Sequence, residues 1–81
     1  MKAHVYVSLK PSVLDPQGQT IYGALKRMHY TGVEDVRQGK YFQLTLSITD
    51  SAGAKAEVER IAREVLTNPV IEEFTYRLEE S

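Results

Sequence analysis

The sequence contains no cysteine and no tryptophan among its 81 residues. Without cysteine the chain has no disulfide framework and no thiolate for catalysis or metal binding, and a reducing compartment is its natural setting. No apolar run approaches the roughly 20 residues that a membrane span requires. The opening stretch MKAHVYVSLK lacks the apolar core of a signal peptide. We therefore expect a cytoplasmic protein with no membrane partner.

The chain also has little excess charge of either sign. Ten basic residues against eleven acidic residues give a formal net charge of −1. Residues 1–40 carry six basic and three acidic side chains, whereas residues 41–81 carry four basic and eight acidic ones. A nucleic-acid-binding surface needs clustered lysine and arginine and a high pI. The sequence therefore predicts no nucleic-acid partner.

The residue patterns of common catalytic, metal and phosphate sites are missing as well. The two histidines, His4 and His29, have no second ligand at a metal-binding spacing. No serine lies in a G-x-S-x-G motif. Gly18 near a helix start could present backbone N–H groups to an anion, but Asp15 would repel that anion. We expect no catalytic residue, bound cofactor or metal in this chain.

Strand and helix patterns alternate in the first half of the chain. Residues 3–10 alternate apolar and polar side chains and predict a half-buried strand, which Pro11 ends. In the stretch VLDPQG, Asp15 is suited to cap a helix and Pro16 to occupy its first position. Apolar residues then follow at helical spacing as far as the region of Gly32, a candidate helix end.

The second half of the chain predicts a hairpin, a helix and a last strand. In VEDVRQGKYFQLTLSIT, Val33 and Val36 lie in a short strand, QGK forms the turn, and residues 41–49 alternate as a longer strand. Asp50 or Ser51 caps a second helix, which Asn68 and Pro69 end. Residues 70–80 form the last strand.

This element order, β-α-β-β-α-β, predicts the α+β class and a ferredoxin-like two-layer sandwich. Its sheet would have four antiparallel strands, with both helices on one face. Right-handed crossovers would place the first and third strands in the middle of the sheet. Residues 1–81 would then form one domain.

The sheet face away from the helices is a candidate interaction surface. Its expected central positions carry tyrosine, threonine, serine and glutamine but no charge, which suits an interface. The strand preference of threonine and tyrosine explains the same composition equally well. If two copies associate, they do so through this face or through an exposed strand edge. The candidate self-association residues are Tyr6, Ser8, Gln43 and Thr45.

Taken together, several stretches resemble a known family. The stretches VYVSLKPSVLDPQGQTI, AL at residues 24–25 and VEDVRQGKYFQLTL are similar to the PurS subunit of bacterial and archaeal phosphoribosylformylglycinamidine synthase. The most specific pieces are SLKPSVLDPQG and VRQGKY, and the late NPVIEEF also looks like the end of that family. The resemblance covers almost the entire chain as one PurS-like domain.

The resemblance implies a subunit of a glutamine-dependent, ATP-consuming ligase of purine biosynthesis. A PurQ-like glutaminase subunit would release ammonia, and a PurL-like synthetase subunit would use it together with ATP and Mg²⁺. The PurS-like subunit would be non-catalytic, would form a dimer or tetramer, and would hold the other two together. The candidate docking residues, in the loop 10–18 and the turn 37–41, are Lys10, Leu14, Asp15, Gln17, Arg37, Lys40 and Tyr41.

Two other functions share this element order. An ACT-like regulatory domain would bind a small molecule between two copies, and its thermal stability would rise with that metabolite. A bridging subunit would be stabilised only by its protein partners. An acylphosphatase-like enzyme would need an arginine and an asparagine on a phosphate loop, and the only asparagine, Asn68, lies in a helix stop.

Overall fold

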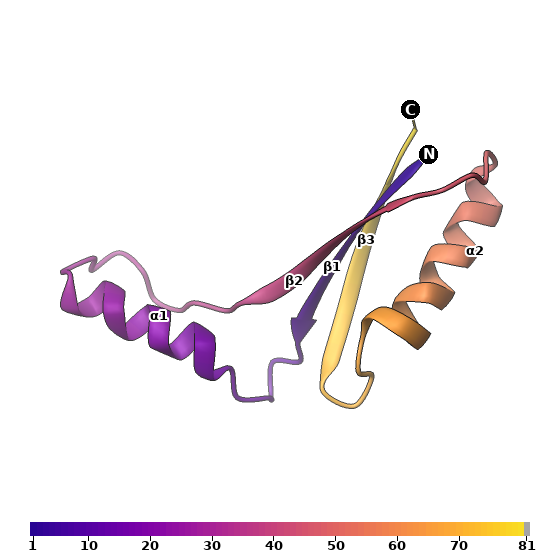
Figure 1. The fold of residues 1–81 in the computed structure, drawn as a ribbon. Helices are drawn as coiled ribbons and strands as arrows, with labels where there is room; N and C mark the ends of the chain where they lie inside the picture. The colour runs from indigo at the N-terminus through magenta and orange to yellow at the C-terminus, as the bar shows by residue number, and fades with distance from the viewer. Residues whose placement is uncertain (81) are drawn as a thin grey trace.

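The computed structural model describes residues 1–80 and contains three strands, two α-helices and one π-helical turn (Figure 1). In chain order these are β1 (Lys2–Leu9), α1 (Pro16–Arg27), β2 (Gly39–Thr45), α2 (Ser51–Ile61), η1 (Ala62–Leu66) and β3 (Glu72–Glu79). The strands form one antiparallel sheet in the order β2-β1-β3. Both edges of the sheet are therefore formed by strands that pair with β1 alone.

The predicted four-stranded sheet is wrong, because the described residues form three strands. Residues 33–38 pair with no strand, and Gly39, predicted to lie in a turn, is the first residue of β2. The first strand is central as predicted, but β2, the predicted third strand, lies at an edge. The QGK hairpin turn is absent, and the chain runs on from residue 33 into β2 without reversing (Figure 1).

Hydrogen bonds to the start of α1 explain why this turn does not form. The backbone N–H of Gln38 donates to Asp15 Oδ2 at 2.8 Å. The Arg37 side chain donates from Nη2 to the carbonyl oxygens of Lys10 and Val13 at 3.1 and 3.2 Å, and lies 3.5 Å from that of Leu9. These bonds attach the segment of the predicted turn to the loop before α1, so the backbone runs on into β2 and does not turn back on itself.

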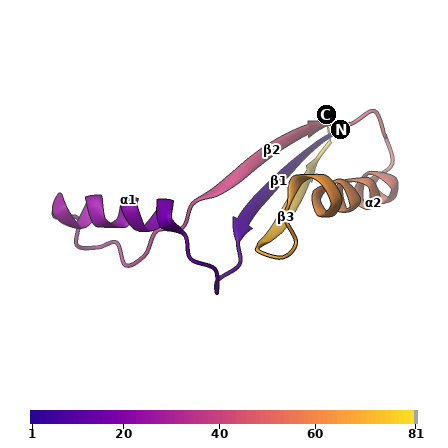
Figure 2. The same cartoon turned by 60° about the horizontal axis from the view of Figure 1, so that its bottom comes forward.

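The prediction that both helices cover one sheet face is also wrong. Only α2 packs on the sheet, whereas α1 and the segment that follows it extend beyond it (Figures 1 and 2). We call residues 16–38 the arm. The chain measures 48 × 28 × 14 Å and has a radius of gyration of 16.0 Å. A compact chain of this length would have a radius of gyration of about 12 Å.

A small apolar core joins β1 to α2. Ala3, Val5 and Val7 point from β1 toward Val58 and Ala62, and all five side chains are almost completely buried. This confirms the apolar face that the alternation in β1 predicts. Partly buried residues of the flanking segments surround the core, namely Phe42, Leu44, Leu46, Leu66, Phe74, Tyr76 and Leu78.

Both predicted helix starts are confirmed. Asp15 accepts a hydrogen bond from the Gly18 N–H, and Asp50 accepts one from the Gly53 N–H, so each carboxylate satisfies a free amide of the first helical turn. The predicted end of the first helix near Gly32 is too late. The helix ends at Arg27, and His29 takes the left-handed conformation with a φ of 68°.

Candidate functional site

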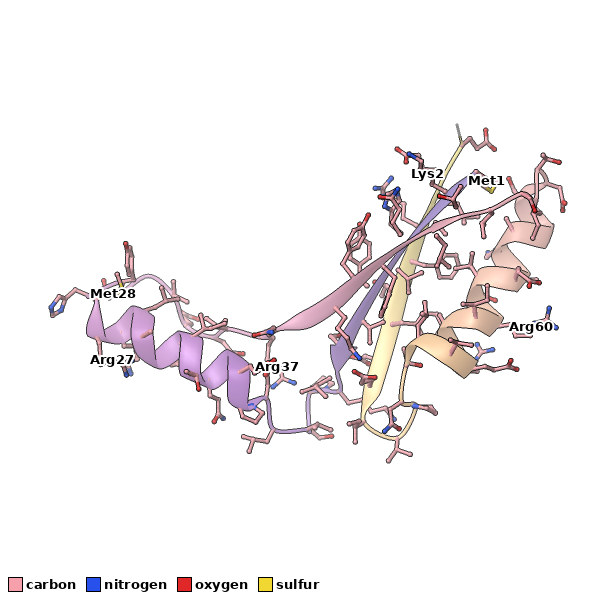
Figure 3. The ribbon with its side chains drawn as sticks, in the orientation of Figure 1. Met1, Lys2, Arg27, Met28, Arg37 and Arg60 are labelled. Carbon is pink, nitrogen blue, oxygen red and sulfur yellow. The ribbon has the colours of Figure 1, made fainter. Side chains whose placement is uncertain are left out.

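The base of the arm is held by a cluster that we call the clamp, formed by Asp15, Gly18, Arg37 and Gln38. Asp15 is only 4% exposed, and each carboxylate oxygen accepts one backbone N–H, from Gly18 at 2.9 Å and from Gln38 at 2.8 Å. The bond from Gln38 is the main reason why the pKa of Asp15 lies below its ordinary value, and the Gly18 bond lowers this pKa further. Figure 3 shows Arg37 at this base, where α1 begins.

Glycine is required at position 18 because two parts of the clamp approach it closely. A Cβ atom on Gly18 would lie 2.5 Å from the carbonyl oxygen of Val36 and 2.5 Å from Asp15 Oδ2. Neither distance is compatible with van der Waals contact, and the Val36 oxygen belongs to the backbone. The stretch VLDPQG therefore both starts a helix and fastens it to the strand that follows.

The predicted docking residues occupy four different settings. Asp15 and Arg37 form hydrogen bonds within the clamp, so these two side chains mainly hold the arm in its position. Leu14 is 63% exposed and Gln17 is also exposed, so these two side chains are open to a partner. Tyr41 lies on the sheet face away from α2, together with the predicted self-association residues.

The remaining two docking residues lie where β1 ends. The backbone N–H of Lys10 donates to the Ile71 carbonyl oxygen at 2.9 Å. Lys40 Nζ lies 3.1 Å from Glu72 Oε2. The pKa of Glu72 is lowered first by a hydrogen bond from the Asn68 N–H and then by Lys40. Lys40 and Glu72 border a hollow of about 220 Å³ together with Asp15, Gln17 and Gln38.

The predicted self-association residues do share one face, which we call the open face. Strand register places Tyr6 between Tyr41 and Thr75, and Ser8 between Gly39 and Glu73. The rings of Tyr6 and Tyr41 are 5.4 Å apart. A shallow hollow of about 500 Å³ adjoins them near Gly39, which has no side chain to fill it. Gln43 and Thr45 continue the same face along β2.

His4 organises the far end of the open face, and the sequence alone did not indicate this. Its Nδ1 lies 2.5 Å from the Tyr41 hydroxyl and its Nε2 lies 3.1 Å from Glu79 Oε2. The ring stacks on Tyr41, and the residue as a whole is 8% exposed. The pKa of Glu79 is lowered, first by the hydrogen bond to His4, with further contributions from Arg77 and Lys2. Only the pairing of β1 with β3, which brings the two ends of the chain side by side, would have indicated this contact.

The described residues contain no group of three or more histidine, cysteine, aspartate or glutamate side chains placed to hold a metal ion. No helix among them is both long enough and apolar enough to cross a membrane.

Comparison with known proteins gives one consistent match. The family model described as "PurS: Phosphoribosylformylglycinamidine (FGAM) synthase" matches residues 2–80. The PurS subunit of Bacillus subtilis phosphoribosylformylglycinamidine synthase is 47% identical over 79 residues, covering 98% of this chain and 93% of that protein. The Mycobacterium leprae PurS subunit is 47% identical over 74 residues, covering 91% and 90%.

Solved structures agree with the sequence matches. Methanocaldococcus jannaschii PurS is 32% identical and superposes with a TM-score of 0.88, covering 99% of this chain and 96% of that chain. A B. subtilis PurS structure gives 0.85 at 47% identity, covering 98% of each chain. A chain of the structure of PurLQS from Thermotoga maritima gives 0.86 at 32% identity, covering 94% and 93%.

Proposed function

Because the chain belongs to the PurS family of phosphoribosylformylglycinamidine synthase subunits, we propose that it is the subunit that holds the glutaminase and the synthetase together. The observation that carries this proposal is the family match over residues 2–80, supported by the similarity to a chain of the T. maritima PurLQS structure. The match is to PurS over nearly the whole chain, so the ACT-like alternative is set aside.

The subunit acts on ammonia transfer without taking part in bond making. Ammonia released into water is protonated and loses its nucleophilic lone pair. Holding the two active sites in one complex raises the local concentration of ammonia and shortens its path through water. In this proposal ATP and Mg²⁺ bind to the PurL-like synthetase, glutamine is hydrolysed on the PurQ-like subunit, and residues 1–81 act as one cytoplasmic, non-catalytic domain.

The loop 10–18 and the residues 37–41 remain the proposed docking region. Within it, Leu14 and Gln17 are the best candidates for direct contact, because both are exposed beside a rigidly held backbone. Asp15 and Arg37 act by holding that backbone in place. Lys10, Lys40 and Tyr41 complete the docking set, at the end of β1 and along β2.

A reconstitution assay with matched variants tests the docking region. Leu14→Glu combined with Gln17→Glu should abolish glutamine-dependent turnover in a mixture with synthetase and glutaminase, because charge is placed on the contact surface. Turnover driven by added ammonia should be retained. The control is Ala52→Glu with Ala56→Glu, which adds the same charge on exposed positions of α2.

Three outcomes would contradict the proposal at different levels. Equal loss of glutamine-dependent and ammonia-dependent turnover would remove the bridging role of this loop. An equal effect of the α2 control would show that the loop has no special part. Turnover that is the same with and without the chain would remove the proposed function altogether. Arg37→Glu is a poorer test, since it would break the bonds to the loop carbonyl oxygens.

The open face is the proposed surface for self-association into a dimer or tetramer. Tyr6, Ser8, Gln43 and Thr45 are exposed on it. The two tyrosine rings supply apolar area, and the surrounding hydroxyl and amide groups supply hydrogen bonds, as in many protein interfaces.

A further inference from the structure

A chain of hydrogen-bonding groups crosses the open face from β3 through β1 to β2. The Nε2 atom of His4 lies 3.1 Å from Glu79 Oε2, and its Nδ1 atom lies 2.5 Å from the Tyr41 hydroxyl. The Tyr41 hydroxyl in turn lies 3.4 Å from Gln43 Oε1. We call these four residues, Glu79, His4, Tyr41 and Gln43, the relay. His4 is its nearly buried centre, whereas Tyr41 and Gln43 are exposed.

The number of protons on His4 decides the direction of each hydrogen bond in the relay. The pKa of Glu79 lies below its ordinary value, so near neutral pH this carboxylate is ionised and can only accept. His4 must therefore carry a proton on Nε2. In a neutral imidazole Nδ1 is then an acceptor, and it takes the single hydroxyl proton of Tyr41. In a charged imidazole Nδ1 is itself a donor, and the hydroxyl proton of Tyr41 is released for another acceptor.

The orientation of the Gln43 side chain matches the charged form of His4. Gln43 turns its oxygen, which can only accept, toward Tyr41. Tyr41 must then donate to Gln43 and has no proton left for His4. The three contacts of the relay are thus satisfied together only when both ring nitrogens of His4 carry protons. With neutral His4 they are satisfied if the Gln43 amide turns over, so that its NH₂ group donates to the Tyr41 oxygen.

The surroundings of His4 supply one direct counter-charge. On this face of the sheet its neighbours from the three strands are Lys2, Tyr6, Tyr41, Gln43, Thr45, Thr75, Arg77 and Glu79. The cations among them, Lys2 and Arg77, are exposed and lower the pKa of Glu79. A proton on His4 therefore forms an ion pair with Glu79, and no isolated charge is buried.

We infer that His4 is a pH-sensitive switch that sets which hydrogen bonds the open face offers at position 43. When His4 is protonated, Gln43 turns its oxygen to Tyr41 and presents its NH₂ group outward as a donor. When His4 is neutral, Gln43 turns its NH₂ group to Tyr41 and presents its oxygen outward as an acceptor. The switch needs only residues of this chain, so it does not depend on the proposed function.

An NMR titration of the full chain between about pH 5 and 8, where histidine ordinarily changes its charge, tests the inference. The side-chain amide signals of Gln43 should shift with the same midpoint as the ring nitrogens of His4. Nuclear Overhauser signals between the Gln43 NH₂ group and the Tyr41 ring should be stronger above that midpoint than below it. Gln43 signals that do not follow His4, or neutral His4 with its proton on Nδ1, would overturn the inference.

Tyr41→Phe separates the relay from a direct effect of charge. Gln43 lies directly opposite His4 in the strand register, so a charge on the ring could shift its signals without any hydrogen bond. The substitution removes the hydroxyl that joins the two residues and keeps the aromatic ring on an exposed position. His4 should still titrate, but the response of Gln43 should be lost. A response that persists in Tyr41→Phe would overturn the inference.

The only other histidine provides a matched control. His29 is exposed in the arm, so His29→Gln should leave the response of Gln43 unchanged, whereas His4→Gln should abolish it. The N-terminal amino group also titrates near neutral pH and donates to the Leu46 carbonyl oxygen at 3.4 Å, and it is kept in both variants. A response of Gln43 that survives His4→Gln, or is lost in His29→Gln, would assign the effect to another group and overturn the inference.

Discussion

Replacing each of two glycines of α1 by alanine should change stability in opposite directions. Gly23 lies in the middle of the helix, and a Cβ atom there would approach only the flexible Arg27 side chain, at 3.5 Å. Gly18 lies at the base, where the same atom would lie 2.5 Å from the Val36 carbonyl oxygen. The two substitutions add the same methyl group to the same helix, so each serves as the control for the other.

The expected magnitudes follow from helix propensity and steric overlap. Gly23→Ala should stabilise the helix by up to about 1 kcal/mol, because alanine loses less backbone entropy than glycine. Gly18→Ala gains part of the same term but must displace a backbone carbonyl and the Asp15 carboxylate, and such overpacking costs about 1–3 kcal/mol. We therefore expect a net loss of about 1–2 kcal/mol at position 18.

Thermal unfolding and amide hydrogen exchange measure these changes. A change of about 1 kcal/mol shifts Tm by roughly 4–8 °C in a domain of this size. The arm can open without the sheet, so exchange of the α1 amides is the sharper measurement, and Gly18→Ala should accelerate it about 5- to 30-fold. Both variants must be measured at the same protein concentration, because self-association raises the apparent stability of the folded state.

One result would refute the reasoning. If Gly18→Ala and Gly23→Ala slow amide exchange in α1 equally, the Val36 carbonyl oxygen does not lie against Gly18. The clamp would then not define the direction of the arm. The same result would weaken the explanation of why the predicted hairpin turn is open.

The remaining predictions concern pH, the clamp and the open face. Stability should fall in acid, because the pKa values of Asp15, Glu72 and Glu79 in the folded protein lie below their ordinary values of 3.8, 4.5 and 4.5. The contribution of these three carboxylates to stability is complete above the ordinary pKa values and is lost as the pH falls through the lowered ones. A free energy of unfolding that stays constant from pH 5 to about pH 2 would contradict this prediction. Asp15→Asn should speed amide hydrogen exchange in α1 at neutral pH and weaken the acid dependence of that exchange. Both carboxylate oxygens of Asp15 accept N–H bonds, whereas a side-chain amide offers only one acceptor oxygen. Unchanged amide exchange at pH 7 would show that the second N–H bond to this side chain is dispensable. Tyr6→Glu with Thr45→Glu should reduce the assembled mass in sedimentation by placing charge on the open face, and an unchanged mass would exclude that face as a contact.

Local signals in the sequence predicted both helix starts and three of the four expected strands. A capping aspartate is recognised by the amides of its own helix, within three residues, so both helix starts could be located. Alternation along β1 correctly separated the buried Val5 and Val7 from the exposed Tyr6. The end of the first helix shows the limit, since the sequence placed it near Gly32, whereas α1 ends at Arg27 and His29 takes the left-handed conformation.

Contacts between distant residues decided the arrangement of these elements. The bond that straightens the predicted turn joins Gln38 to Asp15, 23 positions away. His4 and Glu79, which meet on the open face, are 75 positions apart. Nothing in the sequence near either residue indicates the other, so the three-stranded sheet and the buried histidine could not be predicted.

The sequence by itself determined the family, both helix starts, three of the four expected strands and the apolar side of those strands, because these depend on short motifs and on the periodicity of neighbouring residues. Tertiary structure alone decided that α1 leaves the sheet, that β2 becomes an edge and that His4 lies between Tyr41 and Glu79. The physical reason is that hydrogen bonds between remote segments, and the close approach that Gly18 permits, outweighed a local preference for a hairpin turn.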